Sequence, residues 1–591
     1  MQRMLPLLLA LVPLIIAPHL FFYFDVVPRL AILLVLTAAL MTISQVIRAP
    51  KWLGWIAALQ CLSLAASTLL SSEPWVSLTG STWRRYGLLS QFALLVLTIL
   101  FSQRANLPAC LRAMTLSGLV IAIYGILQYF GIDPLLDKSL YHVGEGIWTI
   151  VRPPGTLGHA DYLGVYLIAV AFSAAALWTI ESNLWWRRIA SVTVPVASIA
   201  IILSGTRAAM LGVVAGTLCC LLLLRPKWNF KHPVAAIVLV AGFVAFYISP
   251  LGLRLRARAR WSSEDSRGGA RLLLWRDSLR MATSKPVIGY GLETFASDFP
   301  PSQSIELAKA FPDFYHESPH NILLDALVSQ GLPGLAILLA LIALGAYSTV
   351  HASEKTPSRI LQGGFVALIV SQQFFSFTVP TALCFYFFLG ALVSLGPQIN
   401  TISIWQPILW RAAAAVLLLL AVRLLVADFL MARVNDKIAA DQIGEATAEY
   451  QKVLRWLPQG STPDLYYSRA MAGAITRVRD PLSSLQAFQQ AMDAGTRAVQ
   501  SSGEPSNAAY SLASLYARKN DAAGVEQSLR TAIAKAPNWF KPHWALARLL
   551  FVQDRLAEAR TEAEAAVERS NGNHKEVLET LGQIRLRQNT K

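Results

Sequence analysis

Arginine, histidine and glycine occur together at four places where an apolar stretch of this chain begins or ends. These places are GSTWRRYGL at 80–88, RPPGTLGH at 152–159, LSGTR at 203–207, and a longer segment from Arg271 to Asn321. A guanidinium group presents a planar fork of donors that matches phosphate oxygens. Glycine lets backbone N–H groups come close to an anion. The four places therefore predict binding of a phosphate-bearing group where the membrane meets water.

His320 lies at the junction between a long polar loop and an apolar stretch. An imidazole that titrates near neutral pH can take the proton from an attacking hydroxyl group. Retaining glycosidases use two separated carboxylates instead, and we find no such signature, since Glu264 and Asp265 are adjacent and followed by Arg267. No cluster of His, Cys or Asp has metal-ligand spacing. We therefore expect no cofactor and a metal-independent reaction.

The composition requires most of the chain to lie in membrane helices. Of the 591 residues, 54% are hydrophobic and 15% are charged, and the mean hydropathy is +0.47. Soluble domains carry about 25% charged residues. We predict an all-α, polytopic membrane protein with about 12–13 transmembrane helices, because apolar stretches near the length needed to cross a bilayer recur along the sequence. The predicted spans are 5–24, 30–47, 52–71, 86–102, 109–130, 161–180, 189–204, 207–224, 233–250, 321–349, 360–378, 380–397 and 408–427.

The placement of arginine and lysine predicts how these helices are oriented. With the N-terminus in the cytoplasm, the loops on that side carry most of the basic residues, as the positive-inside rule requires. The net charge of +16 is then explained by orientation, and we expect no nucleic-acid partner. Residues 251–320 become one large external loop, in which Arg254, Arg256, Arg258 and Arg260 alternate with other residues. Like charges at this spacing repel one another and need anions nearby, either lipid headgroups or a substrate diphosphate.

The character of the chain changes near residue 430. Residues 431–591 are polar, helical in pattern and rich in alanine, whereas 1–430 holds the apolar stretches and the 251–320 loop. A period of 34 residues relates Tyr510 to Trp544, Leu512 to Leu546, Ala513 to Ala547, Leu515 to Leu549, Ala523 to Ala557, and Ala532 to Ala566. This period resembles tetratricopeptide repeats, which stack as an α-solenoid. On the predicted topology the repeats lie on the same side as the external loop.

The order of the short motifs resembles the O-antigen ligase/polymerase superfamily, which includes O-antigen ligases, O-antigen polymerases and bacterial protein O-oligosaccharyltransferases. The motifs are LSGTR at 203–207, then Arg271 and Trp275, then PVIGYG at 286–291, then His320–Asn321, and finally QGLPG at 330–334. The likeness covers roughly residues 190–345, and the motifs with Arg85 and Arg152 extend it upstream. The repeats after residue 430 are not part of the minimal ligase.

This resemblance implies a donor, a site and a reaction. Members of the superfamily use an undecaprenyl-diphosphate-linked glycan as donor, without a nucleotide sugar or a metal. It implies that Arg207 and Arg271 hold the diphosphate and that His320 serves the acceptor, so that direct displacement inverts the anomeric centre. We expect further contributions to substrate binding from Arg84, Arg85, Arg152 and Asn321.

Several functions remain open at this point. The expected activity is that of an O-antigen ligase-type glycosyltransferase in the bacterial inner membrane, with its active site facing the periplasm and lipid A–core of lipopolysaccharide as acceptor. A polymerase would use another glycan chain as acceptor, and an oligosaccharyltransferase would use a protein, which suits repeats that bind peptides or a protein partner. A transporter for a lipid-linked glycan and a membrane-anchored tetratricopeptide scaffold are alternatives of a different class. The transporter predicts ionisable residues deep within the spans, and most of the predicted spans have none at their centres.

Overall fold

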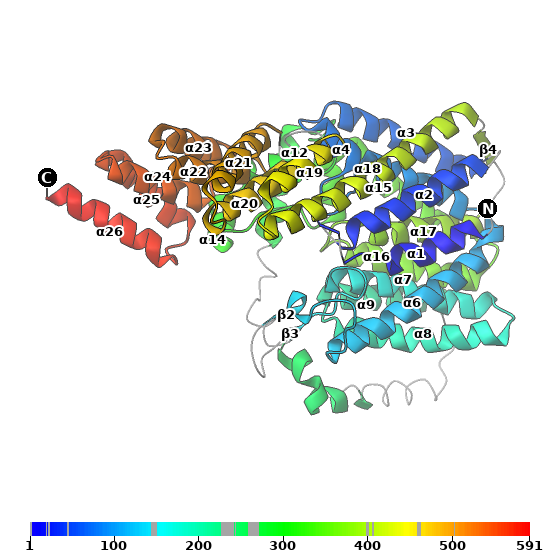
Figure 1. The fold of residues 1–591 in the computed structure, drawn as a ribbon. Helices are drawn as coiled ribbons and strands as arrows, with labels where there is room; N and C mark the ends of the chain where they lie inside the picture. Colours follow the sequence, from blue (N-terminus) through cyan, green and yellow to red (C-terminus); the bar gives the residue numbers. More distant parts are fainter. Residues whose placement is uncertain are drawn as a thin grey trace.

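The computed structural model contains a bundle of long helices, from which a row of shorter helices extends to one side (Figure 1). The described residues are 3–18, 20–21, 24–43, 47–143, 150–225, 241–242, 244–257, 271–397, 401–404, 407–457, 462–501 and 503–590. Half of the predicted span 233–250 falls outside these residues, and so do Arg258, Arg260 and Arg267 of the external loop.

Helices of the bundle run back and forth along one common direction (Figure 1). They are α1 (Met4–Leu14), α2 (Val26–Ile43), α3 (Lys51–Leu69), α5 (Leu88–Phe101), α6 (Leu107–Tyr129), α7 (Ala160–Ile180), α8 (Leu184–Leu203), α9 (Arg207–Leu224), α15 (Ile322–Val350), α16 (Lys355–Ser371), α17 (Val379–Leu395) and α18 (Pro407–Ala439). Shorter elements are α4 (Pro74–Thr79), α12 (Arg271–Ser284), α13 (Phe295–Asp298), α14 (Ile305–Ala310), and the 3-10 turns η1 (Arg104–Asn106), η2 (Lys138–Leu140), η4 (Pro250–Gly252) and η5 (Pro300–Ser302).

Helix α17 is the centre of the bundle. All seventeen of its residues are buried, and it packs against α2, α5, α7, α15 and α16. Its phenylalanines Phe385 and Phe387 meet rings of neighbouring helices, for example Phe387 with Phe101 of α5 at 5.2 Å between ring centroids. A helix that is apolar on every side is stable only when other helices surround it.

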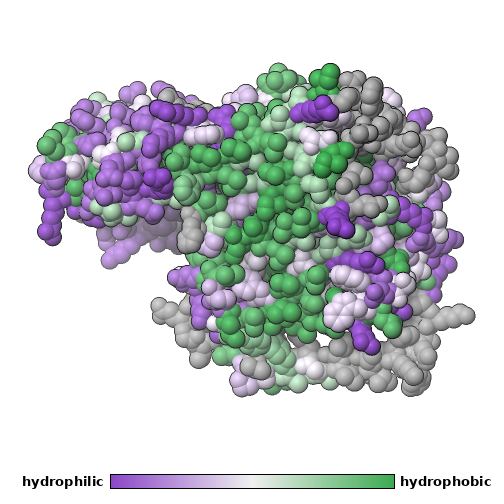
Figure 2. All heavy atoms as spheres, turned by 45° about the vertical axis from the view of Figure 1, so that its right-hand side comes forward, coloured by the Kyte–Doolittle hydropathy of each residue, from purple (hydrophilic) through white to green (hydrophobic). Residues whose placement is uncertain are grey.

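Outer helices present apolar side chains to their surroundings. On α6 the exposed residues Leu116, Val120, Ile123 and Leu127 follow one another at intervals of three and four residues. Figure 2 shows that apolar side chains cover the visible face of the bundle, whereas the C-terminal helices are largely hydrophilic. A surface of this kind is stable in lipid rather than in water.

Among the described residues, eight helices are long and apolar enough to cross a membrane, and three shorter helices are also apolar. The eight correspond to the predicted spans 30–47, 52–71, 109–130, 161–180, 189–204, 207–224, 321–349 and 408–427. The prediction of an all-α polytopic membrane protein is therefore confirmed in this form.

The first predicted span, 5–24, is not one helix. Helix α1 ends at Leu14, and Ile15 already has an extended backbone. Pro13 and Pro18 lack the N–H groups that a continuing helix requires. The chain turns back instead, and Ala17 N donates a hydrogen bond to Phe24 O at 2.7 Å.

Loops between the helices gather at two opposite ends of the bundle. At one end Arg104 forms an ion pair with Glu354, and Arg112 Nε lies 2.6 Å from Glu181 Oε2. The strand β1 (Ile47–Pro50) pairs there with β4 (Thr401–Ile404) in an antiparallel ladder, in register Ile47 to Ile404. A second short ladder joins β2 (His142–Val143) to β3 (Ile150–Val151). The loops joined by these two ion pairs and by the β1–β4 ladder were predicted to lie together on the cytoplasmic side, and they contact one another.

Eight helices follow the bundle and pack in sequence order. They are α19 (Ile443–Leu454), α20 (Thr462–Arg477), α21 (Pro481–Ser501), α22 (Pro505–Arg518), α23 (Ala522–Lys535), α24 (Phe540–Val552), α25 (Leu556–Arg569) and α26 (Lys575–Asn589). Each contacts the next from α20 to α26. The 34-residue period has a structural counterpart, because Asn520 and Asp554 both adopt positive φ values, of 56° and 63°, at equivalent turns.

The C-terminal helices lie at the end of the bundle opposite the β1–β4 ladder (Figure 1). Helix α18 runs through residue 430 without a break and passes directly into these helices. They also contact the loop that precedes α15, since Asn538 Nδ2 donates to Gln303 O at 2.6 Å and Lys309 Nζ lies 3.5 Å from Glu568 Oε1. Tyr315 Oη donates to Gly503 O at 2.8 Å. These contacts fix the helices against the loop that carries His320.

Candidate active site

Predicted site residues gather at the end of the bundle where the C-terminal helices lie. Arg207 and Arg271 are the first residues of α9 and α12, and His320 lies two residues before α15. Arg152 lies shortly before α7, and Arg84 and Arg85 shortly before α5. Because a helix N-terminus carries unsatisfied N–H groups and a partial positive charge, several such ends together favour an anion.

His320 has a strained backbone and a defined polar neighbour. Its φ of 51° is in the left-handed region, which non-glycine residues adopt at a cost. Its Nδ1 lies 3.5 Å from Ser318 Oγ, and Ser376 Oγ donates to that hydroxyl at 2.6 Å. Asn321 then begins the helix, because its side-chain oxygen accepts from the N–H groups of Leu323 and Leu324 at 2.9 and 3.1 Å. Asn321 therefore orients His320 by capping α15.

The imidazole of His320 is held in its neutral form. Burial lowers its pKa to about 4, and the positive charges of Arg271 and Arg84 act in the same direction. Asp161 and Asp325 raise this pKa, but by less. A neutral imidazole can accept a proton at pH 7. The same interactions place His320 within electrostatic reach of Arg84 and Arg271, which come from two of the four predicted segments.

Arg271 is connected to His320 through the turn between α16 and α17. The Arg271 guanidinium lies 5.8 Å from the ring centroid of Phe375, and Trp275 lies 6.0 Å from Phe374. Ser376, the next residue of this turn, donates to Ser318. One turn thus contacts both α12 and the segment before α15.

Arg152 and Thr206, the residue before Arg207, both contact Asp161. Arg152 Nη2 lies 2.6 Å from Asp161 Oδ1, and the hydroxyl of Thr206 donates to the same oxygen at 3.0 Å. Arg207 directly follows Thr206 and is exposed. His159, which precedes α7, accepts a hydrogen bond from Asp161 N at 3.2 Å and so caps that helix. Asp161 was not among the predicted site residues, although an aspartate at the start of an apolar stretch is a signal that could have found it.

Arg84 is engaged by two carboxylates. Its Nη1 and Nη2 lie 2.9 and 3.2 Å from the two oxygens of Asp325, and its Nε pairs with Glu293. Burial alone would lower the pKa of Arg84, but the two carboxylates raise it above the ordinary value. Burial raises the pKa of Glu293. Arg84 therefore joins the loop before α13 to the first turn of α15, and it carries a structural function whether or not it also binds substrate.

Arg85 occupies a different environment from its neighbour. Its side chain is buried, its backbone φ is 52°, and Nη1 donates to Gly80 O at 3.0 Å. Burial lowers its pKa to about 10, although Asp428 and Glu293 oppose this effect. Arg84 and Arg85 are adjacent in sequence, but their side chains have different partners.

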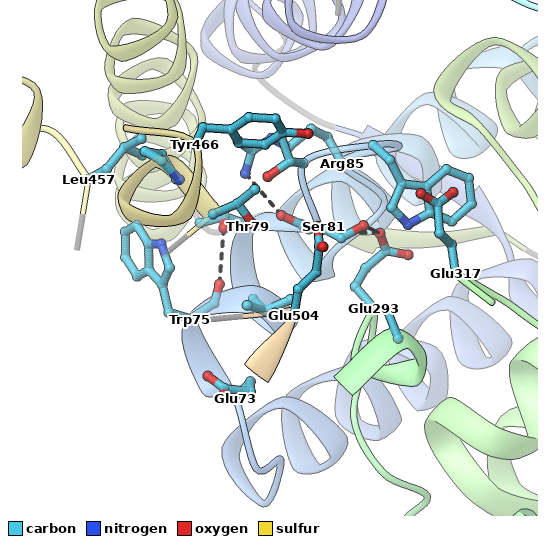
Figure 3. Close-up of a pocket in the computed structure, with 18 of the residues that line it drawn as sticks. Glu73, Trp75, Thr79, Ser81, Arg85, Glu293, Glu317, Leu457, Tyr466 and Glu504 are labelled. Carbon is cyan, nitrogen blue, oxygen red and sulfur yellow. Dashed lines mark hydrogen bonds between the residues drawn. The ribbon is translucent and has the colours of Figure 1, made fainter. Parts of the chain in front are cut away.

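Two pockets lie beside these residues. The first, here called the arginine pocket, is lined by residues that include Asp25, Arg29, Arg84, His159, Tyr162 and Glu317. The second, here called the interdomain pocket, is lined by residues that include Trp75, Trp83, Arg85, Glu317, Tyr466 and Glu504 (Figure 3). Trp83 and Glu317 line both pockets. His320, Arg207 and Arg271 line neither of them, so their relation to the site rests on the contacts described above.

Glu317 was not among the predicted site residues. Burial raises its pKa to about 7, and Glu504 and Glu293 add to this effect while Arg84 opposes it. It lies three residues before His320, in a wall common to both pockets. Its position depends on the C-terminal helices, which no local pattern in the sequence could reveal.

The two glycine-containing motifs, at 286–291 and 330–334, pack against each other. Tyr290 N and Gly291 N donate to Val328 O and Ser329 O at 2.9 and 3.0 Å, so the 286–291 segment docks on α15. Helix α15 is interrupted at this point, since Gly331 has φ 68° and ψ −163°. At Gly289 (φ 76°) a Cβ would lie 2.4 Å from the backbone of Ser329. The two motifs are therefore glycine-rich because two backbones meet.

Residues 192–339 match a family described as O-antigen ligase. The matched range covers about a quarter of the chain, and it contains Arg207, Arg271 and His320 together with both glycine motifs. A comparison with curated proteins gives no match. The family match supports the predicted likeness to the ligase/polymerase superfamily and suggests a membrane glycosyltransferase of this type.

Among the residues that the structure describes, there is no group of three or more His, Cys, Asp or Glu side chains that could hold a metal ion. Metal independence stays a prediction, which the chelator experiment below tests.

Proposed function

We propose that this protein is an O-antigen ligase-like glycosyltransferase, which moves a glycan from an undecaprenyl-diphosphate carrier to an acceptor hydroxyl. The observation that carries the proposal is the position of His320 two residues before α15, with Arg207 and Arg271 at the N-termini of α9 and α12, all within the segment that is similar to O-antigen ligases. We place the protein in the bacterial inner membrane.

The donor's leaving group is a diphosphate, which needs charge stabilisation rather than a proton. Arg271 and Arg207 supply that charge in our proposal, together with the N-terminal ends of α9 and α12. Cations that are already positioned stabilise developing negative charge without reorganising, which is a large contribution to catalysis. The carrier diphosphate leaves as the acceptor oxygen attacks the anomeric carbon from the opposite side, so this carbon inverts.

The acceptor hydroxyl transfers its proton to His320 as it attacks. In the protein without substrate, the charges of Arg271 and Arg84 help to lower the pKa of His320. A bound diphosphate offsets these charges, so the pKa of His320 rises when the donor is present. The base thus becomes stronger in the complex that reacts.

The arrangement of the loops supports a periplasmic active site. The ion pairs of Arg104 and Arg112 lie at the end of the bundle away from His320, as expected for cytoplasmic loops. The C-terminal helices lie at the same end as the site. We propose that these helices are tetratricopeptide repeats, because successive helices pack together and equivalent turns recur at the 34-residue period.

Lipid A–core is the acceptor that we favour, because the matched family is described as O-antigen ligase. The glycolipid profile of a deletion strain separates the alternatives. Loss of long-chain lipopolysaccharide with retention of a lipid-linked polymer indicates a ligase, and chains of a single repeat unit indicate a polymerase. Normal lipopolysaccharide with unglycosylated protein indicates an oligosaccharyltransferase.

A reconstituted reaction tests the proposal itself. Purified protein, lipid-diphosphate glycan and the candidate acceptors are combined, with and without a strong chelator. We expect transfer to an acceptor in both conditions, and loss of turnover in chelator would contradict the metal-independent mechanism. A transporter would instead move the lipid-linked glycan across vesicle membranes without transferring it, and a scaffold would do neither.

A further inference from the structure

We propose that the interdomain pocket is a carbohydrate-binding subsite, which holds sugar rings of one of the two substrates beside the site of transfer. The inference deepens the proposed function and rests on it for the identity of the reaction. The pocket exists because the C-terminal helices pack against the bundle.

Three parts of the chain build this pocket (Figure 3). Trp75, Trp83 and Arg85 come from the segment between α3 and α5, and Glu317 comes from the segment before α15. Tyr466 and other residues of the C-terminal helices close the opposite wall. The seam is held by Tyr315 Oη, which donates to Gly503 O at 2.8 Å, and by the guanidinium of Arg423, which lies 5.1 Å from the ring centroid of Trp75.

Aromatic rings provide the apolar surfaces of the pocket. Trp75, Trp83 and Tyr466 all line it, and a tyrosine or tryptophan combines a broad apolar face with a polar edge. The C–H faces of sugar rings match such surfaces, while their hydroxyl groups remain available at the rim of each ring. A phosphate or a small inorganic ion would leave these aromatic faces unused.

The polar groups of the pocket include both a donor and acceptors. Arg85 is 6% exposed, and within the described part of the chain its Nε meets no hydrogen-bond acceptor. Glu73, Glu317 and Glu504 add carboxyl groups to the same lining. An anion would face these carboxylates, and a cation would face Arg85. A hydroxyl group both donates and accepts, so a polyhydroxylated, uncharged ligand satisfies both kinds of group.

Protonation of the carboxyl groups agrees with a neutral ligand. Burial, with the neighbouring Glu504 and Glu293, raises the pKa of Glu317 to about 7. Burial, with Asp298, also raises the pKa of Glu73. The pocket is therefore less negative near pH 7 than its four carboxyl groups, which include Glu293, suggest. This favours carbohydrate over a lysine-rich or arginine-rich peptide.

The pocket is continuous with the proposed site of transfer. Trp83 and Glu317 form a wall common to the interdomain pocket and the arginine pocket. Only two residues separate Glu317 from His320, and Arg84 follows Trp83 directly. A glycan with one sugar in the interdomain pocket would therefore have its next sugar near His320.

A binding experiment that needs no turnover tests this inference. The full-length protein carries His320→Ala to prevent transfer, and the probes are the oligosaccharide released by acid from the lipid-linked glycan and the delipidated acceptor oligosaccharide. Saturation-transfer NMR and tryptophan fluorescence measure the dissociation constant. We expect one probe to bind, and Trp75→Ala and Glu504→Gln to weaken that binding about fivefold, since an aromatic contact or a hydrogen bond of this kind contributes on the order of 1 kcal/mol.

Glu579→Gln is the matched control, because this side chain is exposed on α26 and pairs with Lys575 outside the pocket. It should bind as the parent protein does. Which probe binds tells whether the sugars belong to the donor or to the acceptor, and the corresponding KM should rise in the pocket variants made with His320 intact. Binding of an acceptor-derived peptide in place of either sugar would overturn the inference.

The two proposals fail in different ways. If neither oligosaccharide binds, or if the pocket variants bind as well as the control, the subsite is wrong even when transfer is observed. If the sugars bind as expected but the intact protein transfers no glycan, the subsite stands and the proposed function is wrong.

Discussion

Replacing Arg84 with methionine should destabilise the protein strongly. The guanidinium of Arg84 lies between Asp325 and Glu293, and the three side chains are 3%, 14% and 1% exposed. Methionine fills similar space but leaves two carboxylates without their cation. Removing one partner from a buried ion pair costs about 3–5 kcal/mol. A change of this size lowers the melting temperature by roughly 6–20 °C if the cooperative unit has about 150–250 residues.

Neutralising the carboxylates should recover most of this loss. The variant Arg84→Met/Glu293→Gln/Asp325→Asn leaves no uncompensated charge in the cluster, and such replacements are often neutral. The defect of the single variant should also shrink at acid pH. Arg84 lowers the pKa of Glu293, so in its absence this pKa is higher, and the carboxylate is neutralised as the pH falls.

The assay is thermal unfolding of the purified protein in detergent between pH 5 and pH 8, with donor binding measured on the same samples. A single variant as stable as the parent would refute the reasoning, as would a triple variant less stable than the single one. If the stable triple variant still fails to bind donor, Arg84 contributes to substrate binding in addition to stability.

Three further predictions concern the site and its support. Burial, Arg271 and Arg84 lower the pKa of His320 to about 4, so its proton-accepting form persists as the pH falls below 6.5 and is lost near pH 4. In pH–rate profiles kcat/KM should therefore fall at a lower pH than kcat does, because bound diphosphate raises the pKa of His320. If both parameters fall at the same pH, the proposed effect of the diphosphate on His320 is contradicted. Gly289→Ala should cost more than about 1–2 kcal/mol, since positive φ is disfavoured for alanine and its Cβ would lie 2.4 Å from the backbone of Ser329. Gly582→Ala on α26 is its control, because a Cβ there meets nothing within 4 Å. Equal melting temperatures of the two variants would contradict the close packing of Gly289 against the backbone of Ser329. Arg271→Gln should raise the KM for the donor about tenfold or more, given about 1.5–3 kcal/mol for a charged hydrogen bond, and Arg271→Lys should raise it less; an unchanged KM for Arg271→Gln would exclude this arginine from donor binding.

Hydropathy located the helices well because lipid imposes a strong and local requirement. An apolar stretch such as 321–349 must bury its backbone polar groups in a helix, and the structure has α15 at Ile322–Val350. The same reasoning failed for 5–24, where Pro13 and Pro18 interrupt an apolar sequence and the chain turns. Average hydropathy does not register the missing N–H group of proline.

Cations of the candidate site were visible in the sequence, but their partners were not. Arginine next to glycine at a helix boundary is a local signal, and it identified Arg84 and Arg85. The carboxylates that engage Arg84 come from Glu293 and Asp325, more than 200 positions along the chain. Which acid meets which base depends on how the helices pack, so the different environments of the two adjacent arginines required the structure.

The transfer rate of the His320→Ala variant tests most directly whether His320 is the base of the reaction. Purified wild-type and variant proteins are mixed with labelled lipid-diphosphate glycan and acceptor, and release of carrier diphosphate is followed together with the anomeric configuration of the product. We predict inverted product from the wild-type protein, and a variant that melts at the wild-type temperature and binds donor but is slower by about 10²–10⁴-fold, as expected when a general base is removed. Transfer at the wild-type rate by the variant, or retention at the anomeric carbon, would contradict the account.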